Sequence, residues 1–383
     1  MKYYLIAGEP SGDLHGSYLI RAIRAEDPTA EFRAWGGDLM AAAGAELVTH
    51  YRELAFMGVV EVIKNLPTIL RNQRRCQADI AAWQPDRLVL IDYSGFNLRI
   101  AKWAKPAGFD VSYYISPQVW ASRSGRVKQI KAYVDRMLVI LPFEEAWYRE
   151  RGVAAVFVGH PLLDYVREKG EKKKEEGEKS VEKRDEQQTE EDQKTIALLP
   201  GSRTQEITVG LPLMLAAAAE LPEHDYVIAG APSRDLAFYE TLIASCGRAP
   251  KNVRVVMNRT YAVLQSAHAA VVTSGTATLE TALFGVPQVV VYKGNWLAYR
   301  IAKWMIANRI RYISLVNLVM DAPVVPELIQ HDFNPQNLAD HLQKTIAGPV
   351  RDQQLNDLSR LREKLGSGGA ARRAARAIVG ITS

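Results

Sequence analysis

Short apolar runs alternate with longer amphipathic stretches along the first part of the chain. The runs typical of strands cover residues 3–7, 87–91, 111–115 and 136–141. Residues 14–25 and 69–83 carry apolar side chains at helical spacing. Strands that alternate with helices in this way form βαβ units, so the pattern predicts a parallel sheet.

The same alternation returns later in the chain. Its apolar runs cover residues 195–199, 225–229, 253–257, 269–273 and 288–292. The stretch between the two halves, residues 167–194, has almost no apolar residue and carries charges of both signs. Such a segment buries too little surface to offset its ordering entropy, so we predict a solvated linker or a mobile helix there. The nearly balanced charges argue against the alternative of a binding tail.

These patterns predict an α/β protein with two Rossmann-like, doubly wound domains that face each other across a cleft. We expect an N-terminal domain over residues 1–166 and a C-terminal domain over residues 195–383, with the last helix able to pack back on the first domain. A length of 383 residues suits two domains. Ligands of open α/β sheets bind beyond the carboxyl ends of the strands, where the polar turns of this chain lie.

Charge and cysteine content narrow the class of protein only slightly. A net charge of +5 allows an anionic partner, which could be a lipid surface, a nucleic acid or a phosphorylated substrate. Cys76 and Cys246 lack CxxC spacing, which argues against a disulfide framework and a zinc site. No apolar run approaches the ~18 residues that span a bilayer, and the first run is too short for a signal peptide. We therefore expect a cytoplasmic protein.

Two turns in the first half carry groups suited to ligand chemistry. The turn Gly8–Asp13 opens a helix whose N-terminus favours an anion, but it matches neither GxGxxG nor the P-loop pattern. The alternative is a plain turn in which Ser11 or Asp13 caps the helix. Asp92 follows directly after an apolar strand. It could act as a general base, or it could simply cap the next helix.

The turn after residues 195–199 offers a phosphate site. Gly201 and Ser202 supply hydrogen-bond donors, and Arg203 supplies a planar cation that fits phosphate oxygens. An arginine here could stabilise a leaving diphosphate, although an ordinary surface arginine is the alternative.

The turn after residues 269–273 is the most informative. Ser274, Gly275 and Thr276 are small, so a diphosphate could approach the N-terminus of the next helix. Glu280 lies one turn further on and could accept hydrogen bonds from ribose hydroxyls, or it could only complement the helix dipole. Together with Arg203, this turn favours binding of a nucleotide diphosphate.

Three runs, at residues 54–70, 116–131 and 296–311, combine apolar or aromatic residues with basic ones. Such runs are typical of interfacial helices at an anionic membrane. A buried helix with solvated charges explains them equally well. The candidate membrane contacts are Met57, Val59, Val60, Ile63, Trp120, Arg123, Arg126, Trp296 and Trp304.

Nine ordered motifs together resemble the lipid-A-disaccharide synthase family. They are AGEPSGD at 7–13, AFMGVVEV at 55–62, IDYSGFN at 91–97, YISPQVWA at 114–121, LPFE at 141–144, GHPLLD at 159–164, LLPGSR at 198–203, SGTATLE at 274–280 and YISLVNLV at 312–319. The resemblance implies a GT-B fold whose C-terminal domain binds UDP. It also implies an inverting transfer of 2,3-diacylglucosamine from its UDP derivative to 2,3-diacylglucosamine 1-phosphate, giving the β-1,6-linked disaccharide 1-phosphate of lipid A.

The resemblance also implies a setting and a set of residues. The enzyme would be peripheral on the cytoplasmic face of a Gram-negative inner membrane, would need no metal or cofactor, and could form a homodimer. By motif, the functional carboxylate falls on Asp92, the essential arginine on Arg203 and the loop asparagine on Asn317, while Glu9 and Ser11 match the first glycine loop. Glu9 is the second candidate for the base.

One motif departs from the family pattern. The family has a proline and a second acid after the position of Asp92, where this chain has Ser94 and Gly95. Asp92 is therefore the single acid of its loop, which argues against a mechanism with two carboxylates there. Three alternatives stay open: a UDP-N-acetylglucosamine 2-epimerase, another GT-B glycosyltransferase such as the peptidoglycan-precursor N-acetylglucosaminyltransferase, and a non-enzymatic basic membrane scaffold.

Overall fold

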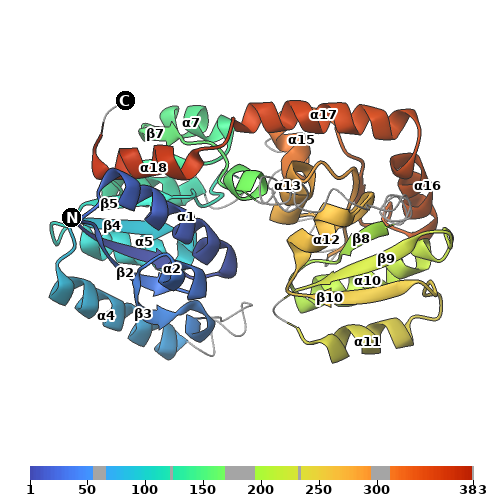
Figure 1. Cartoon of the computed structure of the whole chain (residues 1–383), viewed down its shortest axis with the longest axis horizontal. Coiled ribbons are helices and arrows are strands. Elements are labelled where there is room, and N and C mark those ends of the chain that lie inside the picture. Colours follow the sequence, from blue (N-terminus) through green and yellow to red (C-terminus); the bar gives the residue numbers. More distant parts are fainter. Residues whose placement is uncertain (55–65, 121–123, 169–194, 232–233, 295–310, 382–383) are drawn as a thin grey trace, which may run out of the picture. The chain divides into compact units, whose positions relative to one another are not determined.

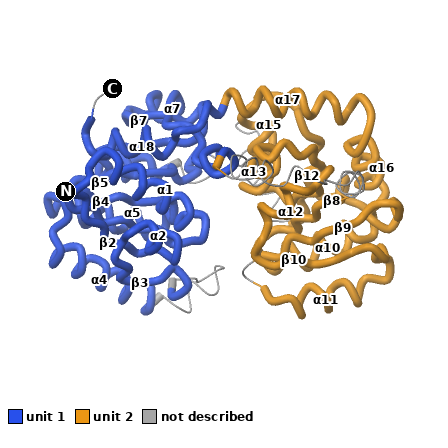
Figure 2. Tube along the Cα trace, viewed as in Figure 1, with its two compact units in different colours: residues 1–167, 365–383 blue, residues 168–364 orange. Residues whose placement is uncertain are grey.

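The computed structural model describes residues 1–54, 66–120, 124–168, 195–231, 234–294 and 311–381. The chain divides into two compact units, which Figure 2 distinguishes by colour. Unit 1 comprises residues 1–167 and 365–383, and unit 2 comprises residues 168–364. Most of the predicted linker, residues 169–194, lies outside the described residues.

Unit 1 is built on a seven-stranded parallel sheet in the order β3-β2-β1-β4-β5-β6-β7. The strands are β1 (Lys2–Ala7), β2 (Glu31–Gly36), β3 (Glu46–His50), β4 (Arg87–Ile91), β5 (Val111–Tyr114), β6 (Arg136–Val139) and β7 (Ala155–Phe157). The predicted runs coincide with β1, β4, β5 and β6. The prediction missed β3 and β7 because they are edge strands, where partly exposed positions interrupt the apolar run, and it also missed β2.

Helices cover both faces of this sheet (Figure 1). They are α1 (Pro10–Glu26), α2 (Asp38–Ala42), α4 (Leu66–Trp83), α5 (Ser94–Ala104), α6 (Val127–Tyr133), α7 (Pro142–Arg149) and α18 (Ala370–Val379), with 3-10 turns at η1 (Tyr51–Leu54) and η2 (Ser124–Arg126). Alternate side chains of β1 enter opposite layers. Tyr4 and Ile6 pack in one core with α4, α5, α6 and α7, whereas Tyr3 and Leu5 pack in the other with α1, α2 and α18.

The helix α18 follows unit 2 in the sequence and belongs to unit 1, where it lies beside α1 (Figure 1). Its N-terminus is capped by the carboxylate of Asp164, which accepts hydrogen bonds from the backbone N–H groups of Gly369 and Ala371. The Arg373 guanidinium donates to the Val158 carbonyl at 2.8 Å. Part of the GHPLLD motif therefore serves to hold α18.

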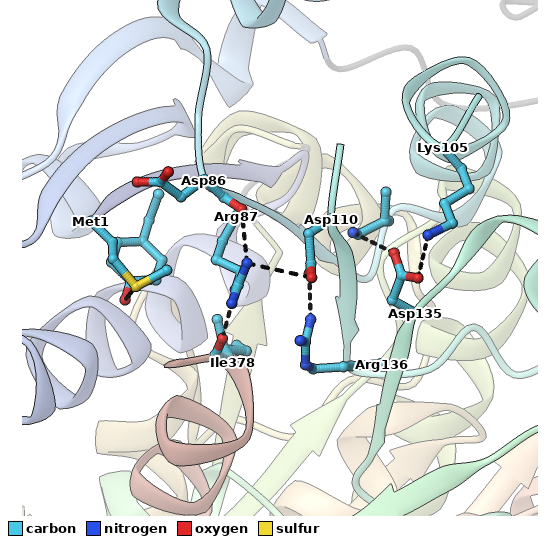
Figure 3. Close-up of polar contacts among 10 residues, drawn as sticks. Met1, Asp86, Arg87, Lys105, Asp110, Asp135, Arg136 and Ile378 are labelled. Carbon is cyan, nitrogen blue, oxygen red and sulfur yellow. Dashed lines mark hydrogen bonds and ion pairs between the residues drawn. The ribbon is translucent and has the colours of Figure 1, made fainter. Parts of the chain in front are cut away.

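An ion-pair network joins the amino ends of the central strands of unit 1 (Figure 3). Asp110, which precedes β5, pairs with Arg87 at the start of β4 and Arg136 at the start of β6. The Arg87 guanidinium also donates to the Ile378 carbonyl of α18 at 3.1 Å. Asp135 accepts from the Val111 N–H at 2.9 Å and pairs with Lys105. The network lies at the amino ends of the strands, whereas the polar turns lie at their carboxyl ends.

Replacing Asp110 by asparagine should lower the free energy of unfolding by about 1–2 kcal/mol, because two partly buried guanidinium groups lose their counter-ion. Urea denaturation measures the change. Glu150→Gln removes an exposed partner of Arg151 and is the control, with an expected change under about 0.5 kcal/mol. An equal change in the two variants would contradict a structural role for the network.

Unit 2 is built on a six-stranded parallel sheet in the order β10-β9-β8-β11-β12-β13. The strands are β8 (Thr195–Leu199), β9 (Asp225–Gly230), β10 (Val253–Met257), β11 (Ala269–Thr273), β12 (Gln288–Tyr292) and β13 (Glu327–Ile329). The first five coincide with the predicted apolar runs. The edge strand β13 spans three residues, too few to produce a recognisable pattern.

The helices of unit 2 also lie on both faces of its sheet. They are α10 (Thr204–Ala218), α11 (Leu236–Ser245), α12 (Thr260–Ser266), α13 (Thr276–Leu283), α15 (Leu315–Met320), α16 (Pro335–Ile346) and α17 (Pro349–Leu365). Ile196 and Leu198 of β8 pack in the core with α10, α11 and α16, and Ala197 and Leu199 pack in the core with α12. The prediction of two α/β domains with parallel sheets is therefore confirmed.

No helix in the described ranges is long and apolar enough to cross a bilayer. Most of the predicted membrane contacts cannot be placed, since Met57, Val59, Val60, Ile63, Arg123, Trp296 and Trp304 lie outside the described residues. The other two, Trp120 and Arg126, both belong to unit 1.

Candidate active site

The first polar turn of unit 1 begins α1 with Glu9 at the N-cap and Pro10 in the first turn. The alternative that Ser11 or Asp13 caps this helix is therefore wrong. The buried carboxylate of Asp13 instead accepts from the N–H groups of Gly37, Leu39 and Met40 at 2.9–3.1 Å, and so caps α2. This leaves Glu9 and Ser11 exposed at the turn.

The turns after β1 and β4 meet in unit 1. These strands are neighbours, and the chain continues from them toward opposite edges of the sheet. A Cβ atom on Gly8 would lie 2.4 Å from the ring of Tyr93, so only glycine allows the close approach. Such a switch point is where open α/β sheets bind ligands.

The backbone at Asp92 and Tyr93 is strained. Both residues lie in the left-handed region, with φ values of 45° and 43°, which costs about 1–3 kcal/mol for each non-glycine residue. Hydrogen bonds hold this conformation: the Asn97 side-chain amide donates to the Asp92 carbonyl at 2.9 Å, and the Tyr113 hydroxyl donates to the same carbonyl at 2.6 Å. Backbone strain of this kind concentrates at functional sites.

The Asp92 carboxyl group is electrostatically unusual. Burial raises the pKa of Asp92 to about 6, and the nearby Glu9 carboxylate contributes to the rise. A base with this pKa can accept a proton near neutral pH. The helix α5 has Tyr93 at its N-cap and no side-chain capping bond, so the alternative that Asp92 only caps this helix is wrong.

The structure places Arg126 and Trp120, both predicted as membrane contacts, next to polar groups of unit 1. The Arg126 guanidinium donates to the Ser94 hydroxyl at 2.9 Å, directly beside the Asp92 turn. The Trp120 indole N–H donates to the Glu144 carboxylate at 3.2 Å. Burial raises the pKa of Glu144 to about 7, although the N–H groups of Ile140 and Leu141 also donate to it.

Glu144, which holds the Trp120 side chain, was not among the predicted site residues. A signal was present, because proline at the first position of α7 and glutamate at the third are typical of a helix N-terminus. What the sequence does not show is that the same carboxylate holds Trp120 of the YISPQVWA motif.

In unit 2, the turn after β8 presents Arg203 to solvent. Gly201 has a φ of 101°, and a Cβ atom there would lie 2.8 Å from a carboxylate oxygen of Glu206. Arg203 is the N-cap of α10, and its guanidinium pairs with Glu206 at 2.9 Å while its side chain is 77% exposed. The Arg203 side of this pair is open to solvent, which weakens the pair, so an anionic ligand can replace Glu206 as its partner. Ser202 is also exposed in this turn.

The neighbouring turn after β11 leads into α13. Gly275 is its N-cap, and Gly275 and Thr276 are exposed. The Ser274 hydroxyl donates to the Ile313 carbonyl at 2.9 Å. Because β8 and β11 are adjacent at the switch point of the sheet, the Arg203 turn and the α13 N-terminus lie side by side. A cation beside a helix N-terminus suits a diphosphate.

Two further predicted residues already have partners inside unit 2. Glu280 accepts from the Tyr261 hydroxyl at 3.0 Å, and burial raises the pKa of Glu280. The side-chain amide of the buried Asn317 bonds to the backbone of Val325 and to the Glu327 carboxylate, each at 2.9 Å. Direct substrate contact by either residue stays a prediction.

Each unit thus has a doubly wound parallel sheet with polar turns at its switch point, and unit 2 suits a nucleotide diphosphate. This combination is that of the GT-B class of nucleotide-sugar enzymes. Several solved structures share this fold, among them the following two. The UDP-GlcNAc 2-epimerase from Neisseria meningitidis bound to UDP-GlcNAc has a TM-score of 0.70 at 12% identity, covering 99% of this chain and 100% of its own. The glycotransferase of kitacinnamycin has a TM-score of 0.63 at 17% identity, and the match covers 99% of this chain and 98% of that one.

Sequence similarity is more specific than the fold. A model of the lipid-A-disaccharide synthetase family matches residues 3–379. The lipid-A-disaccharide synthase of Syntrophus aciditrophicus strain SB is 43% identical over 380 residues, which cover 97% of this chain and 95% of that protein. The chain belongs to the lipid-A-disaccharide synthase family and is a hexosyltransferase. The predicted family and enzyme class are confirmed, and the epimerase shares only the fold.

Proposed function

We propose that this chain transfers 2,3-diacylglucosamine from UDP-2,3-diacylglucosamine to 2,3-diacylglucosamine 1-phosphate. The products are the β-1,6-linked disaccharide 1-phosphate and UDP. Membership of the lipid-A-disaccharide synthase family supports the identity of the two substrates. The buried Asp92 carboxyl group at a strained turn, with its pKa raised to about 6, supports the chemistry. A hydroxyl acceptor needs one such base, and Asp92 is the only acid in its loop.

The proposed reaction is a single displacement. Asp92 accepts the proton of the acceptor's 6-hydroxyl group, directly or through a water molecule, and the hydroxyl oxygen forms a bond to the anomeric carbon of the donor. The bond from that carbon to the UDP oxygen breaks on the opposite side, so the anomeric centre is inverted. The leaving oxygen takes the electron pair, and UDP departs with an added negative charge.

The turns of unit 2 would stabilise that charge. Arg203 and the α13 N-terminus would bind the diphosphate, with donors from Gly201, Ser202 and the residues 274–276. Glu280 would accept from the ribose hydroxyls through its second carboxylate oxygen, since the first accepts from Tyr261. Ser11 is a further predicted substrate contact, whereas Asn317, whose side-chain amide bonds to Val325 and Glu327, would act on the site indirectly. The mechanism requires no metal or cofactor.

Glu9→Gln should move the acidic limb of the kcat/KM profile to lower pH. The Glu9 carboxylate helps to raise the pKa of Asp92, so removing its charge lowers that pKa, and Asp92 stays ionised further into acid. A pH profile of kcat/KM reports this pKa in the free enzyme. Glu26→Gln, at the other end of α1, is the control and should leave the limb near pH 6. An unchanged limb in Glu9→Gln would show that Asp92 is not the titrating base.

The proposal includes a place for the enzyme in the cell. We propose that the chain binds an anionic membrane surface from the cytoplasmic face of the inner membrane, because both substrates carry acyl chains. The basic, apolar runs at residues 54–70 and 296–311 would make the contact. A homodimer is compatible with this arrangement.

The purified protein should form the tetraacyl disaccharide 1-phosphate from UDP-2,3-diacylglucosamine and 2,3-diacylglucosamine 1-phosphate, as detected by mass spectrometry. Incubation with UDP-N-acetylglucosamine alone should leave that sugar unchanged. Epimerisation of the free UDP-sugar, without disaccharide formation in the first assay, would overturn the proposal.

A further inference from the structure

A single carboxylate organises the backbone next to the proposed nucleotide site. Glu327, the first residue of β13, accepts from the N–H groups of Ile313 and Ser314 and from the side-chain amide of Asn317. The shortest contacts to Ser314 and Asn317 are 2.9 Å, and the shortest to Ile313 is 3.0 Å. Hydrogen bonds to an ionised acceptor are about twice as strong as neutral ones. We call these bonds from Glu327 to Ile313, Ser314 and Asn317 the anchor, and they hold the segment strongly.

The same backbone segment holds the turn that leads into α13. The Ser274 hydroxyl donates at 2.9 Å to the carbonyl of Ile313, which shares a peptide group with the N–H of Ser314. Glu327 and Ser274 therefore bond to opposite sides of one peptide unit. Such a chain of hydrogen bonds is cooperative, because each bond polarises the next.

Asn317 completes the anchor. Its backbone N–H donates to the Ser314 hydroxyl at 3.2 Å, and this bond caps the N-terminus of α15. Its side-chain amide bonds to both the N–H and the carbonyl of Val325, two residues before Glu327. The loop before α15 is thus fixed to the start of β13, and Ser274 is fixed to that loop.

We infer that Glu327 is a positioning residue for the nucleotide site: through the 313–314 peptide it holds Ser274, and so sets the place of the α13 N-terminus. The inference rests on the proposed binding of UDP by this turn. Glu327 itself bonds to the Ile313–Asn317 segment and not to the turn, so its effect on a ligand passes through Ser274. Asn317 shares this role, which explains why its amide is directed into the protein.

UDP affinity, measured by titration calorimetry, tests the inference. Glu327→Ala should weaken UDP binding about tenfold or more, because the charge-assisted anchor is lost. Glu327→Gln keeps one acceptor oxygen and should restore most of the affinity. The donor KM should rise in Glu327→Ala by a larger factor than kcat falls, since Asp92 lies in the other unit.

Gln354→Ala is the matched control. Gln354 is a buried residue of α17 whose side chain accepts from the Gln288 N–H at 2.9 Å, at the amino end of β12. Losing this bond should lower the melting temperature of unit 2 while leaving UDP affinity unchanged. Equal loss of affinity in Gln354→Ala and Glu327→Ala would mean that Glu327 acts only through stability.

A double-mutant cycle gives the second test. Ser274→Ala and Glu327→Ala act through one peptide group, so their effects on UDP affinity should be clearly less than additive. Additive effects, or full affinity in Glu327→Ala, would overturn the inference. Absence of UDP binding to the unmutated protein is a different result, because it would overturn the proposed function instead.

Discussion

Asp92→Asn is expected to lower turnover by at least about a hundredfold, the lower range for loss of a general base. Asparagine has nearly the same shape, so the turn held by Asn97 and Tyr113 should persist. The amide cannot accept the proton of the acceptor hydroxyl. The measurement is the rate of disaccharide formation by the purified variant, compared at equal concentration of folded protein.

The stability of the Asp92→Asn variant should not fall with its activity. The pKa of Asp92 is raised in the folded protein, so the folded state binds its proton more tightly than the unfolded chain does. This group therefore destabilises the fold as pH rises from about 4 to about 6, and the penalty is full above that range. Asp92→Asn should melt no lower than the parent at pH 7.5, with the difference vanishing near pH 4. Near-normal turnover would remove Asp92 from the role of base.

Arg203→Ala should also lower turnover by about a hundredfold or more, because the charge that develops on the departing UDP loses its cation. The fold should tolerate the change, since the Arg203 side chain is 77% exposed. The backbone N–H of residue 203 can still donate to Glu206, so the start of α10 is kept. Turnover and UDP affinity should be measured together, since an effect confined to UDP affinity would indicate ground-state binding only.

Arg248→Ala is the matched control for this variant. The Arg248 side chain is 79% exposed, and its partner Glu220 lies at 4.0 Å. The two variants remove the same charge from equally exposed positions of unit 2, so any effect of net charge is common to both. Equal turnover in Arg203→Ala and Arg248→Ala would contradict the assignment.

The sequence predicted most of the sheet framework because buried parallel strands are nearly continuous apolar runs. β8, β9, β11 and β12 are examples, and the turns that follow β8 and β11 could be located with them. The edge strands β3, β7 and β13 were missed, since partly exposed or very short strands lack this pattern.

Contacts between distant residues could not be predicted in this way. Asp13 looks like a cap for its own helix, yet its carboxylate caps α2, and Asp164 caps a helix some two hundred residues later. No local pattern distinguishes these aspartates from ordinary loop acids. The left-handed conformation of Asp92 and Tyr93 was equally hidden, because neither residue is glycine and only the surrounding contacts impose it.

The position of α18 has a consequence for how the protein is made. Ala374, Ala375 and Ile378 are fully buried in the core that contains Tyr3 and Leu19, although all of unit 2 separates them in the chain. A nascent chain of which only residues 1–167 have left the ribosome therefore still exposes this apolar layer. Domains usually fold in order of synthesis. Here the core of unit 1 is completed only after α18, the last helix, has been synthesised. Truncation before residue 370 should leave unit 1 prone to aggregation even though its whole sheet is present.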